Sequence, residues 1–312
     1  MYMKVKVIIG IVTIVVLVLG GLGWGVNYLF NYAIVRGDKD FISAEAASGG
    51  KSKGYDSWEF ADEKPETLTQ KTKDGLMLKA THFKQKQEGT AKLAIVAHGY
   101  TSDGMHMKDY AKMFYEMGYD VLVPDARAHG NSEGEYIGFG WPDRLDYLNW
   151  IKQMTDAYND NVDIALYGIS MGASTVMMVS GEKLPDNVKA IIEDCGYDTV
   201  ENELKHQLGE MFGLPSFPLI PITSQYSKLR AGYDFKEASA VKQLEKNKLP
   251  MLFIHGDKDD FVPTKMVYPL YEATKGPKEL VIVKGAKHAE AFTQDPGKYQ
   301  KMVSNFLADY IK

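Results

Sequence analysis

IALYGISMGASTV, residues 164–176, is the stretch that decides the fold. A short apolar run leads into Gly168, and Ser170 is followed by Gly172 and by residues that suit a helix. The pattern G-x-S-x-G between a strand and a helix is typical of a tight turn that lifts the serine Oγ above the edge of a sheet. Glycines two positions before and after the serine leave room for that turn. The bare pattern also fits a glycine-bounded turn with an incidental serine, so the rest of the chain must supply a base, an acid and an oxyanion donor.

The chain around this stretch alternates strands and helices. Asp74-Gly75 separates two segments of alternating polarity, which predicts an antiparallel hairpin at the start of the domain. Continuous apolar strands separated by helices then predict a mostly parallel sheet with helices on both faces. The fold class expected is therefore α/β. The predicted strands after the hairpin are 92–98, 121–124, 162–167, 188–193, 251–255 and 280–283.

Residues 198–243 interrupt this alternation. Apolar positions at helical spacing are followed by GLPSFPLIPI, a run that contains three prolines. A long insertion after a strand of a compact domain is usually a lid or a binding loop. We expect a small cap over the site, with a plain surface excursion as the alternative.

The amino terminus predicts a membrane anchor. Residues 7–26 carry no charge and are almost wholly apolar, and about 20 such residues span a bilayer as a helix. Lys4 and Lys6 precede the run, and Trp24 and Tyr28 lie at its far end, where interfacial aromatics are expected. We expect a transmembrane anchor at 1–30, a flexible linker at 31–63 and an extracytoplasmic domain at 64–312. A cleaved signal peptide is the alternative, although an A-x-A site comes only at residues 44–46.

Composition excludes several classes of protein. The 312 residues have a formal net charge of −5, and no basic run follows the amino terminus, which argues against nucleic-acid binding. Cys195 is the only cysteine, so the chain can form neither an internal disulfide nor a cysteine-rich metal site. We expect no metal and no organic cofactor.

A serine nucleophile needs a base, and the base needs a carboxylate. His288 follows the last predicted strand, and loops after the carboxyl ends of parallel strands share one rim with Ser170. The segment FIHGDKDDFVP offers Asp259, with Asp257 as its competitor on spacing, and Asp194 is a third candidate. The expected chain order is serine, acid, histidine.

The oxyanion formed during acyl transfer would bind two backbone N–H groups. One belongs to Met171, the residue after the serine, at the start of a helix. The other belongs to Tyr100 in the loop HGYTSDG, after the first parallel strand. The Tyr100 side chain could also line the pocket.

Five motifs in order, HGYTSDG, DARAHGNSEG, GISMG, HGDKDDFVP and GAKH, resemble the α/β-hydrolase superfamily over about residues 67–312. They are most similar to its membrane-anchored bacterial serine hydrolases, classed with esterases, lysophospholipases and serine aminopeptidases. The resemblance places the acid at Asp259 and gives Arg127 and His129 a loop-organising role. The chain departs from the family at Glu290, two residues after the histidine, where an acid could disfavour anionic substrates.

The expected function is hydrolysis of carboxylic esters by a Ser-His-Asp triad. The expected substrate is a small acyl ester, and the location of the anchor is compatible with a lipid or a cell-envelope ester. One alternative is an aminopeptidase of the same fold, whose acidic pocket could come from Glu290 or from the insertion acids Glu201, Glu203 and Glu210. The other is a non-catalytic surface binding protein.

Overall fold

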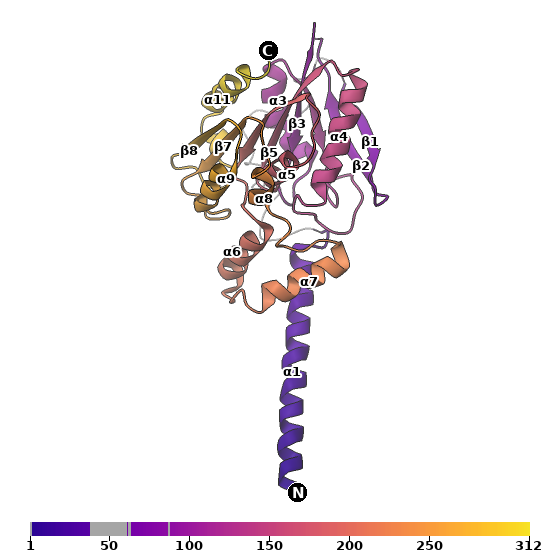
Figure 1. Ribbon diagram of the computed structural model, residues 1–312, viewed down its shortest axis with the longest axis vertical. Coiled ribbons are helices and arrows are strands. Elements are labelled where there is room, and N and C mark those ends of the chain that lie inside the picture. The colour runs from indigo at the N-terminus through magenta and orange to yellow at the C-terminus, as the bar shows by residue number, and fades with distance from the viewer. Residues whose placement is uncertain (1, 38–60, 62–63, 87) are drawn as a thin grey trace.

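The structure, a computed structural model, describes residues 2–37, 61, 64–86 and 88–312 (Figure 1). Its centre is an eight-stranded sheet with the order β1-β2-β4-β3-β5-β6-β7-β8. Strand β2 is antiparallel to both of its neighbours, and the remaining neighbouring pairs are parallel. This confirms the predicted α/β fold, with a mostly parallel sheet and an amino-terminal hairpin. The strands are β1 (Glu66–Lys71), β2 (Met77–Phe83), β3 (Ala91–Ala97), β4 (Asp120–Pro124), β5 (Val162–Ile169), β6 (Val188–Asp194), β7 (Met251–Gly256) and β8 (Lys278–Val283).

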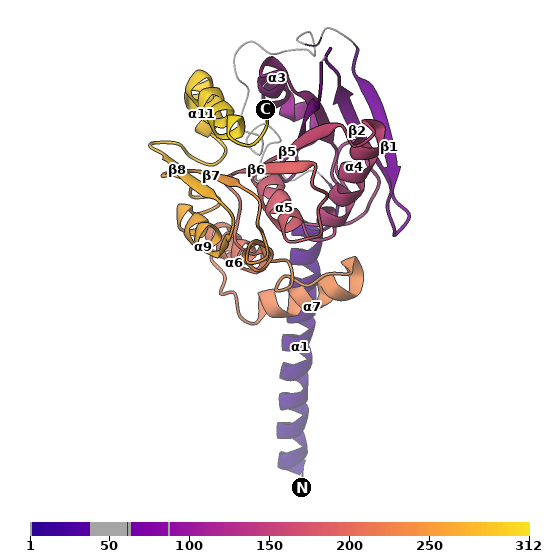
Figure 2. The same ribbon diagram turned by 45° about the horizontal axis from the view of Figure 1, so that its top comes forward.

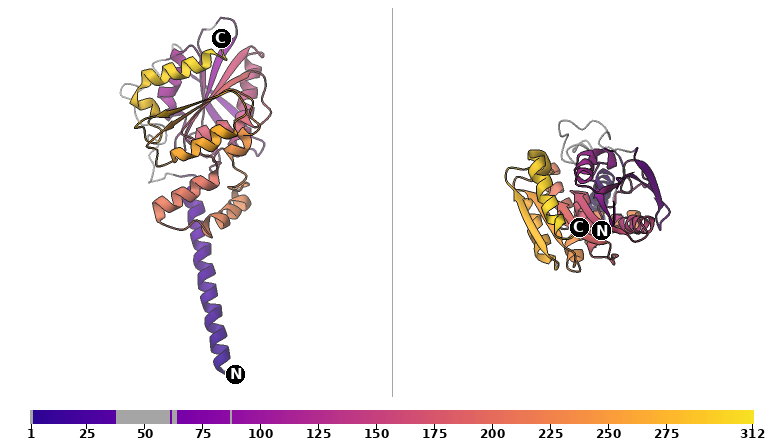
Figure 3. Two further views of the ribbon diagram at one scale, coloured as in Figure 1. Left: turned by 60° about the vertical axis from the view of Figure 1, so that its left-hand side comes forward. Right: turned by 90° about the horizontal axis from the view of Figure 1, so that it is seen from above.

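Helices cover both faces of the sheet (Figure 3). Along β3, Leu93 and Ile95 belong to one buried apolar cluster, whereas Ala94 and Val96 belong to another. Successive side chains of a strand point to opposite faces, so a strand buried on both faces reads as one continuous apolar run. The first cluster includes side chains of α4 (Asp143–Ala157), α5 (Met171–Ser180), α8 (Ala240–Leu244) and α9 (Val267–Ala273), and the second those of α3 (Lys108–Glu116), α10 (Ala291–Gln294) and α11 (Pro296–Ala308).

The segment 198–243, called the insertion below, leaves the sheet after β6 and carries helices α6 (Val200–Phe212) and α7 (Leu219–Ala231). The Thr199 side chain caps α6 by accepting a hydrogen bond from Asn202 N, and Gly213 ends it in the left-handed region at φ 62°. A bridge between Thr199 and Ser239 joins the two ends of the insertion. Figures 1 and 2 show α6 and α7 at one end of the domain, beside α1.

Helix α1 (Tyr2–Ala33) extends from the domain as a rod (Figure 1). Residues 4–21 are exposed, whereas Val26, Phe30 and Ile34 are buried against the domain. These three positions lie four apart, so they form one face of the helix end. Among the described residues, Lys4–Ala33 is the one helix long and apolar enough to cross a membrane, a test that a signal sequence also passes.

The expected linker at 31–63 does not begin at residue 31. Residues 31–33 continue α1, and Ile34 is fully buried. Val35 then forms an antiparallel bridge with Tyr136, and the Arg36 guanidinium donates to two backbone carbonyls of the loop at 130–132. The prediction was wrong for residues 31–36. It rested on the small and polar residues later in the segment and gave too little weight to the short apolar pair at 34–35. Residues 38–60 and 62–63 of the expected linker lie outside the described part of the chain.

Candidate active site

Ser170 lies on the turn between β5 and α5, in a strained conformation with φ 55° and ψ −118°. Its backbone N–H donates to Asp194 O at 2.8 Å, which fixes the turn to strand β6. A Cβ at Gly168 would collide with the backbone of Gly172, and one at Gly172 would collide with the carbonyl of Ala97. Both glycines are therefore required by close approach of backbone to backbone.

The structure brings Ser170, His288 and Asp259 together at the carboxyl ends of β5, β7 and β8. His288 Nε2 lies 2.9 Å from Ser170 Oγ, and His288 Nδ1 lies 2.8 Å from Asp259 Oδ2. An ionised carboxylate only accepts hydrogen bonds, so Nδ1 carries the proton and Nε2 is left to accept from the serine hydroxyl. The geometry gives the tautomer that a general base requires.

The Asp259 carboxylate is held on both oxygens. Oδ1 accepts from the backbone N–H groups of Phe261 and Val262 at 3.1 and 2.9 Å, while Oδ2 faces His288. Burial alone would raise the pKa of Asp259, but the charge and hydrogen bonds of His288 and His255 lower it to about 2. Asp259 is therefore ionised wherever His288 works as a base.

A second histidine supports the same carboxylate. His255 is fully buried on β7, with Nε2 3.3 Å from Asp259 Oδ2 and 2.9 Å from Val262 O. Burial would lower the pKa of His255, but its contacts with Asp259, together with the charge of Glu193, raise it. Sequence reasoning did not give His255 this role; its spacing of four residues from Asp259 was the available signal.

The two competing acids, Asp257 and Asp194, form hydrogen bonds to other groups. Asp257 Oδ1 accepts from Gly285 N at 2.6 Å, and Asp194 Oδ2 accepts from the Tyr299 hydroxyl at 2.7 Å. Of the three candidate carboxylates, Asp259 is the one that hydrogen-bonds to His288.

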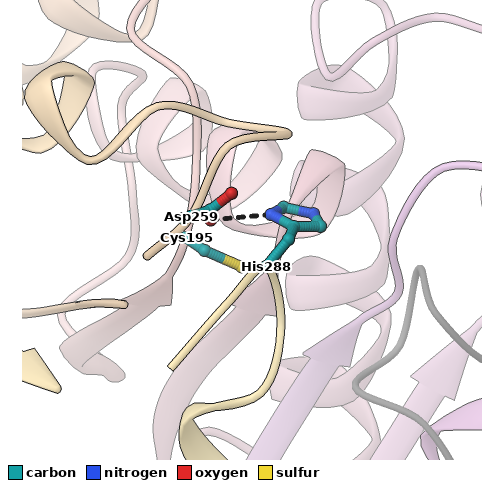
Figure 4. A group of neighbouring side chains, drawn as sticks. All are labelled: Cys195, Asp259 and His288. Carbon is teal, nitrogen blue, oxygen red and sulfur yellow. Dashed lines mark hydrogen bonds and ion pairs between the residues drawn. The ribbon is translucent and has the colours of Figure 1, made fainter. Parts of the chain in front are cut away.

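Cys195 lies beside the pair formed by Asp259 and His288 (Figure 4). One ligand atom of each of these three residues lies within 4.8 Å of the others, a spacing that could hold a metal ion. Burial raises the pKa of the Cys195 thiol well above its usual range. His288 Nδ1 is hydrogen-bonded to Asp259, and the thiol is packed beside this pair.

The loop that carries Tyr100 is braced by His98. Ala126 N donates to His98 Nε2 at 2.9 Å, so His98 Nδ1 carries the proton and donates to Gly99 O at 2.7 Å. The Tyr100 hydroxyl donates to Ala33 O at 2.8 Å, which ties this loop to the end of α1.

His129 and Arg127 brace the neighbouring loop. His129 Nε2 accepts from Thr101 N at 3.3 Å, and burial lowers the pKa of His129 to about 3, with neighbouring His98 contributing. His129 is therefore neutral, which leaves its Nε2 unprotonated and able to accept this hydrogen bond. Arg127 donates to the buried carboxylate of Asp146 and also pairs with Asp74. These contacts agree with the loop-organising interpretation of both residues.

Comparison with known proteins gives one family model and several relatives that are similar to this chain. Residues 89–195 match a family model described as serine aminopeptidase, S33. The chain is 29% identical over 303 residues to the uncharacterized protein YqkD of Bacillus subtilis, covering 97% of each chain. It is 28% identical over 182 residues to the lysophosphatidylserine lipase ABHD12 of Macaca fascicularis, covering 55% of this chain and 42% of that one.

The fold comparison identifies the architecture. An esterase of Pyrococcus furiosus superimposes with a TM-score of 0.66 at 22% identity, covering 85% of this chain and 98% of that one. The chain has the α/β-hydrolase fold. In this fold, the strand order and the turn at Ser170 place the three side chains at the sheet's carboxyl edge.

A pocket that is partly open to solvent lies next to Ser170. Met171 and Tyr100 line it together with Ser170, so both residues expected to supply oxyanion N–H groups face the same space. Met171 begins α5, and the first N–H groups of a helix have no acceptor within it. Most other lining residues are apolar and come from α1, α6, α7 and the loop after β7.

Of the four acids considered for an amine-binding pocket, Glu203 alone lines this pocket. Its Oε1 accepts from Gln207 Nε2 at 2.8 Å, and its Oε2 has no hydrogen-bond partner within the described chain. Burial raises the pKa of Glu203 to about 8, so the side chain is mostly protonated at neutral pH. Glu201 pairs with Lys205, and Glu290 accepts from Lys287 N. Glu210 is exposed on α6.

Proposed function

We propose that this protein is a serine hydrolase of the α/β-hydrolase superfamily that cleaves carboxylic esters through an acyl-enzyme. The observation that carries the proposal is the continuous hydrogen-bonded line from Asp259 through His288 to Ser170, ending at an apolar pocket. A serine hydroxyl becomes an effective nucleophile when an oriented imidazole accepts its proton.

The reaction follows from the positions of these groups. His288 Nε2 takes the Ser170 proton as Oγ attacks the ester carbonyl, and Asp259 stabilises the imidazolium. The N–H groups of Met171 and Tyr100 bind the oxyanion of the tetrahedral intermediate. His288 then protonates the departing alcohol. Water, deprotonated by His288, releases the carboxylic acid and restores the serine.

We also propose that residues 1–30 anchor the domain in a membrane, with residues 64–312 outside the cytoplasm. The exposed apolar stretch of α1 supports the anchor, and Lys4 and Lys6 at its start support the orientation. The insertion would act as the cap, because α6 and α7 both contribute to the pocket next to Ser170. The lipase activity named for ABHD12 and the esterase from Pyrococcus furiosus favour an ester substrate.

A serine aminopeptidase is the second candidate, because the matched family model carries that description. An aminopeptidase must bind a substrate ammonium group, for which a cluster of ionised carboxylates is suited. This pocket offers Glu203, which burial keeps largely protonated near pH 7. A panel that compares aryl esters with aminoacyl aryl amides separates the two candidates, and we expect faster turnover of the esters.

The deciding experiment uses the Ser170→Ala variant. We expect turnover of a short-chain aryl ester to fall by about four to six orders of magnitude, and labelling by a fluorophosphonate probe to disappear. Ser304→Ala, at an exposed position on α11, is the matched control and should retain both. Unchanged hydrolysis by Ser170→Ala would refute the mechanism, and a wild-type protein that neither labels nor turns over would favour the non-catalytic binding protein.

A further inference from the structure

We propose that the substrate enters the pocket directly from the bilayer. The end of α1 forms one wall of the acyl-binding pocket, and exposed apolar side chains of the insertion, called the rim below, contact the membrane surface beside the pocket. The substrate class is then an amphiphile with one long acyl chain. This inference rests on the proposed hydrolase function and adds the source of the substrate and its route.

The exposed part of α1 locates the membrane. Residues 4–21 are all exposed, and at 1.5 Å per residue these 18 residues extend about 27 Å. That length matches the hydrocarbon core of a bilayer, about 30 Å. The membrane surface therefore lies near Trp24, which is 72% exposed, where the domain begins to contact the helix.

The insertion meets α1 at this level. Leu219, at the start of α7, lies next to Gly25, and the Tyr226 ring packs edge-on against Phe30 at 4.9 Å. On the other helix of the insertion, the Phe212 ring lies 6.2 Å from that of Tyr28. Figures 1 and 3 show α6 and α7 beside α1 where the rod leaves the domain.

The rim consists of Leu214, Phe217, Ile222 and Leu229, large apolar side chains of the insertion that are exposed. Phe217 is 77% exposed and Leu229 is 84% exposed, which is a high exposure for side chains of this size. None of the four lines the pocket. A bilayer is the occupant that accounts for the rim, because the exposed apolar stretch of α1 extends past α7 on the side away from the sheet (Figure 1).

The pocket wall is part of the same helix. Leu29, Tyr32 and Ala33 of α1, and Ile34 directly after it, line the pocket that contains Ser170, together with apolar residues of α6 and α7. This end of α1 is fixed to the domain through the Tyr100 hydroxyl on Ala33 O and through Arg36. The distance between the pocket and the membrane surface is therefore fixed by α1. An acyl chain that leaves the bilayer beside α1 remains in contact with apolar side chains as it enters the pocket.

The first test compares two substrates of the full-length protein reconstituted in phosphatidylcholine vesicles. One is a monoacylglycerol with an oleoyl chain, carried in the vesicles, and the other is p-nitrophenyl butyrate in solution. For the double variant Phe217→Ser/Leu229→Ser, we expect turnover of the vesicle-borne ester to fall about tenfold or more because the rim loses its apolar contact. Turnover of the soluble ester should stay within about twofold. The matched control is Tyr268→Ser, an exposed aromatic on α9 that belongs neither to the rim nor to the residues that line the pocket.

An equal fall on both substrates, or no fall on either, would overturn the inference. Wild-type protein that hydrolyses p-nitrophenyl butyrate but not the vesicle-borne ester would also overturn it while leaving the proposed hydrolase intact. No hydrolysis of either substrate would remove the proposed function itself.

The second test concerns the wall. Leu29→Trp fills the pocket from α1, so the ratio of turnover on long-chain to short-chain aryl esters should fall about tenfold. Leu17→Trp, on the same helix but 18 Å lower by the helical rise of 1.5 Å per residue, is the control and should leave the chain-length profile unchanged. Identical profiles for the two variants would show that α1 is not a wall of the acyl site.

Discussion

Glu193, at the carboxyl end of β6, makes the stability of this protein depend on pH. The side chain is fully buried, its Oε2 accepts from Gly196 N at 3.0 Å, and its Oε1 has no hydrogen-bond partner in the described residues. Burial raises the pKa of Glu193 to about 8 from its ordinary value of 4.5. Replacing it by glutamine keeps the shape and the acceptor and removes the ionisation.

The sign follows from linkage. The unfolded chain loses the Glu193 proton near pH 4.5, whereas the folded chain keeps it to about pH 8. The stabilisation is therefore complete below pH 4.5 and is lost as pH rises to 8. At 1.36 kcal/mol per unit of pKa, this one group changes the free energy of unfolding by about 1.4 kcal/mol per pH unit, or about 5 kcal/mol over the window. For a domain of this size, 1 kcal/mol shifts Tm by about 2–4 °C.

The assay is thermal unfolding of the full-length protein in one detergent at pH 5, 6, 7 and 8. The Tm of the wild type should fall steadily from pH 5 to pH 8. Glu193→Gln should make the slope of Tm against pH shallower by about 3–5 °C per pH unit. Part of the slope should remain, because burial also raises the pKa of Glu203 to about 8. Glu210→Gln, at an exposed position, controls for the removal of a carboxylate. A Glu193→Gln slope equal to that of wild type would refute the reasoning.

Three further predictions concern the triad, the turn at Ser170 and the end of α1. Asp259→Asn should lower kcat by about 10⁴, because the amide favours the wrong His288 tautomer; a kcat within tenfold of wild type would contradict this. Gly172→Ala should lower Tm and kcat/KM together, since its Cβ meets the Ala97 carbonyl, whereas Gly209→Ala, with open space around it, should not. A protein shortened to residues 38–312 should unfold at lower urea than one shortened to 22–312, because it loses the buried side chains of Val26, Phe30 and Ile34, worth together at most about 4–9 kcal/mol. Equal urea midpoints would show that this face of α1 does not stabilise the domain.

Sequence reasoning worked where a short pattern has one physical meaning. Asp74-Gly75 between alternating segments predicted the hairpin, and the structure pairs Glu66–Lys71 with Met77–His82 in antiparallel register. Continuous apolar strands predicted burial on both faces of the sheet. The convergence of Ser170 and His288 was expected because parallel strands end at one rim, and the structure places the two side chains 2.9 Å apart.

The docking of residues 34–35 was missed because it depends on long-range contacts. Ile34 and Val35 are a short apolar pair, and their partners, such as Tyr136, lie a hundred residues away. Local periodicity cannot report such a contact, because nothing in the immediate sequence distinguishes a docked segment from a linker.

The support of Asp259 by His255 was missed for a different reason. The two residues are only four apart, but their contact requires the loop after β7 to turn back on the strand, and spacing alone does not show that turn.

The docking of α1 changes how the anchor relates to catalysis. Tyr100 is expected to supply one oxyanion N–H, and its hydroxyl donates to the carbonyl of Ala33, the last residue of α1. The same loop is held from its other side by His98 and His129. A displacement of α1 therefore acts, through the hydrogen bond between Tyr100 and Ala33, on the loop whose backbone would bind the oxyanion. Tyr100→Phe removes that bond but keeps the ring, so an effect on kcat rather than on KM would identify α1 as a positioning element for the reaction as well as an anchor.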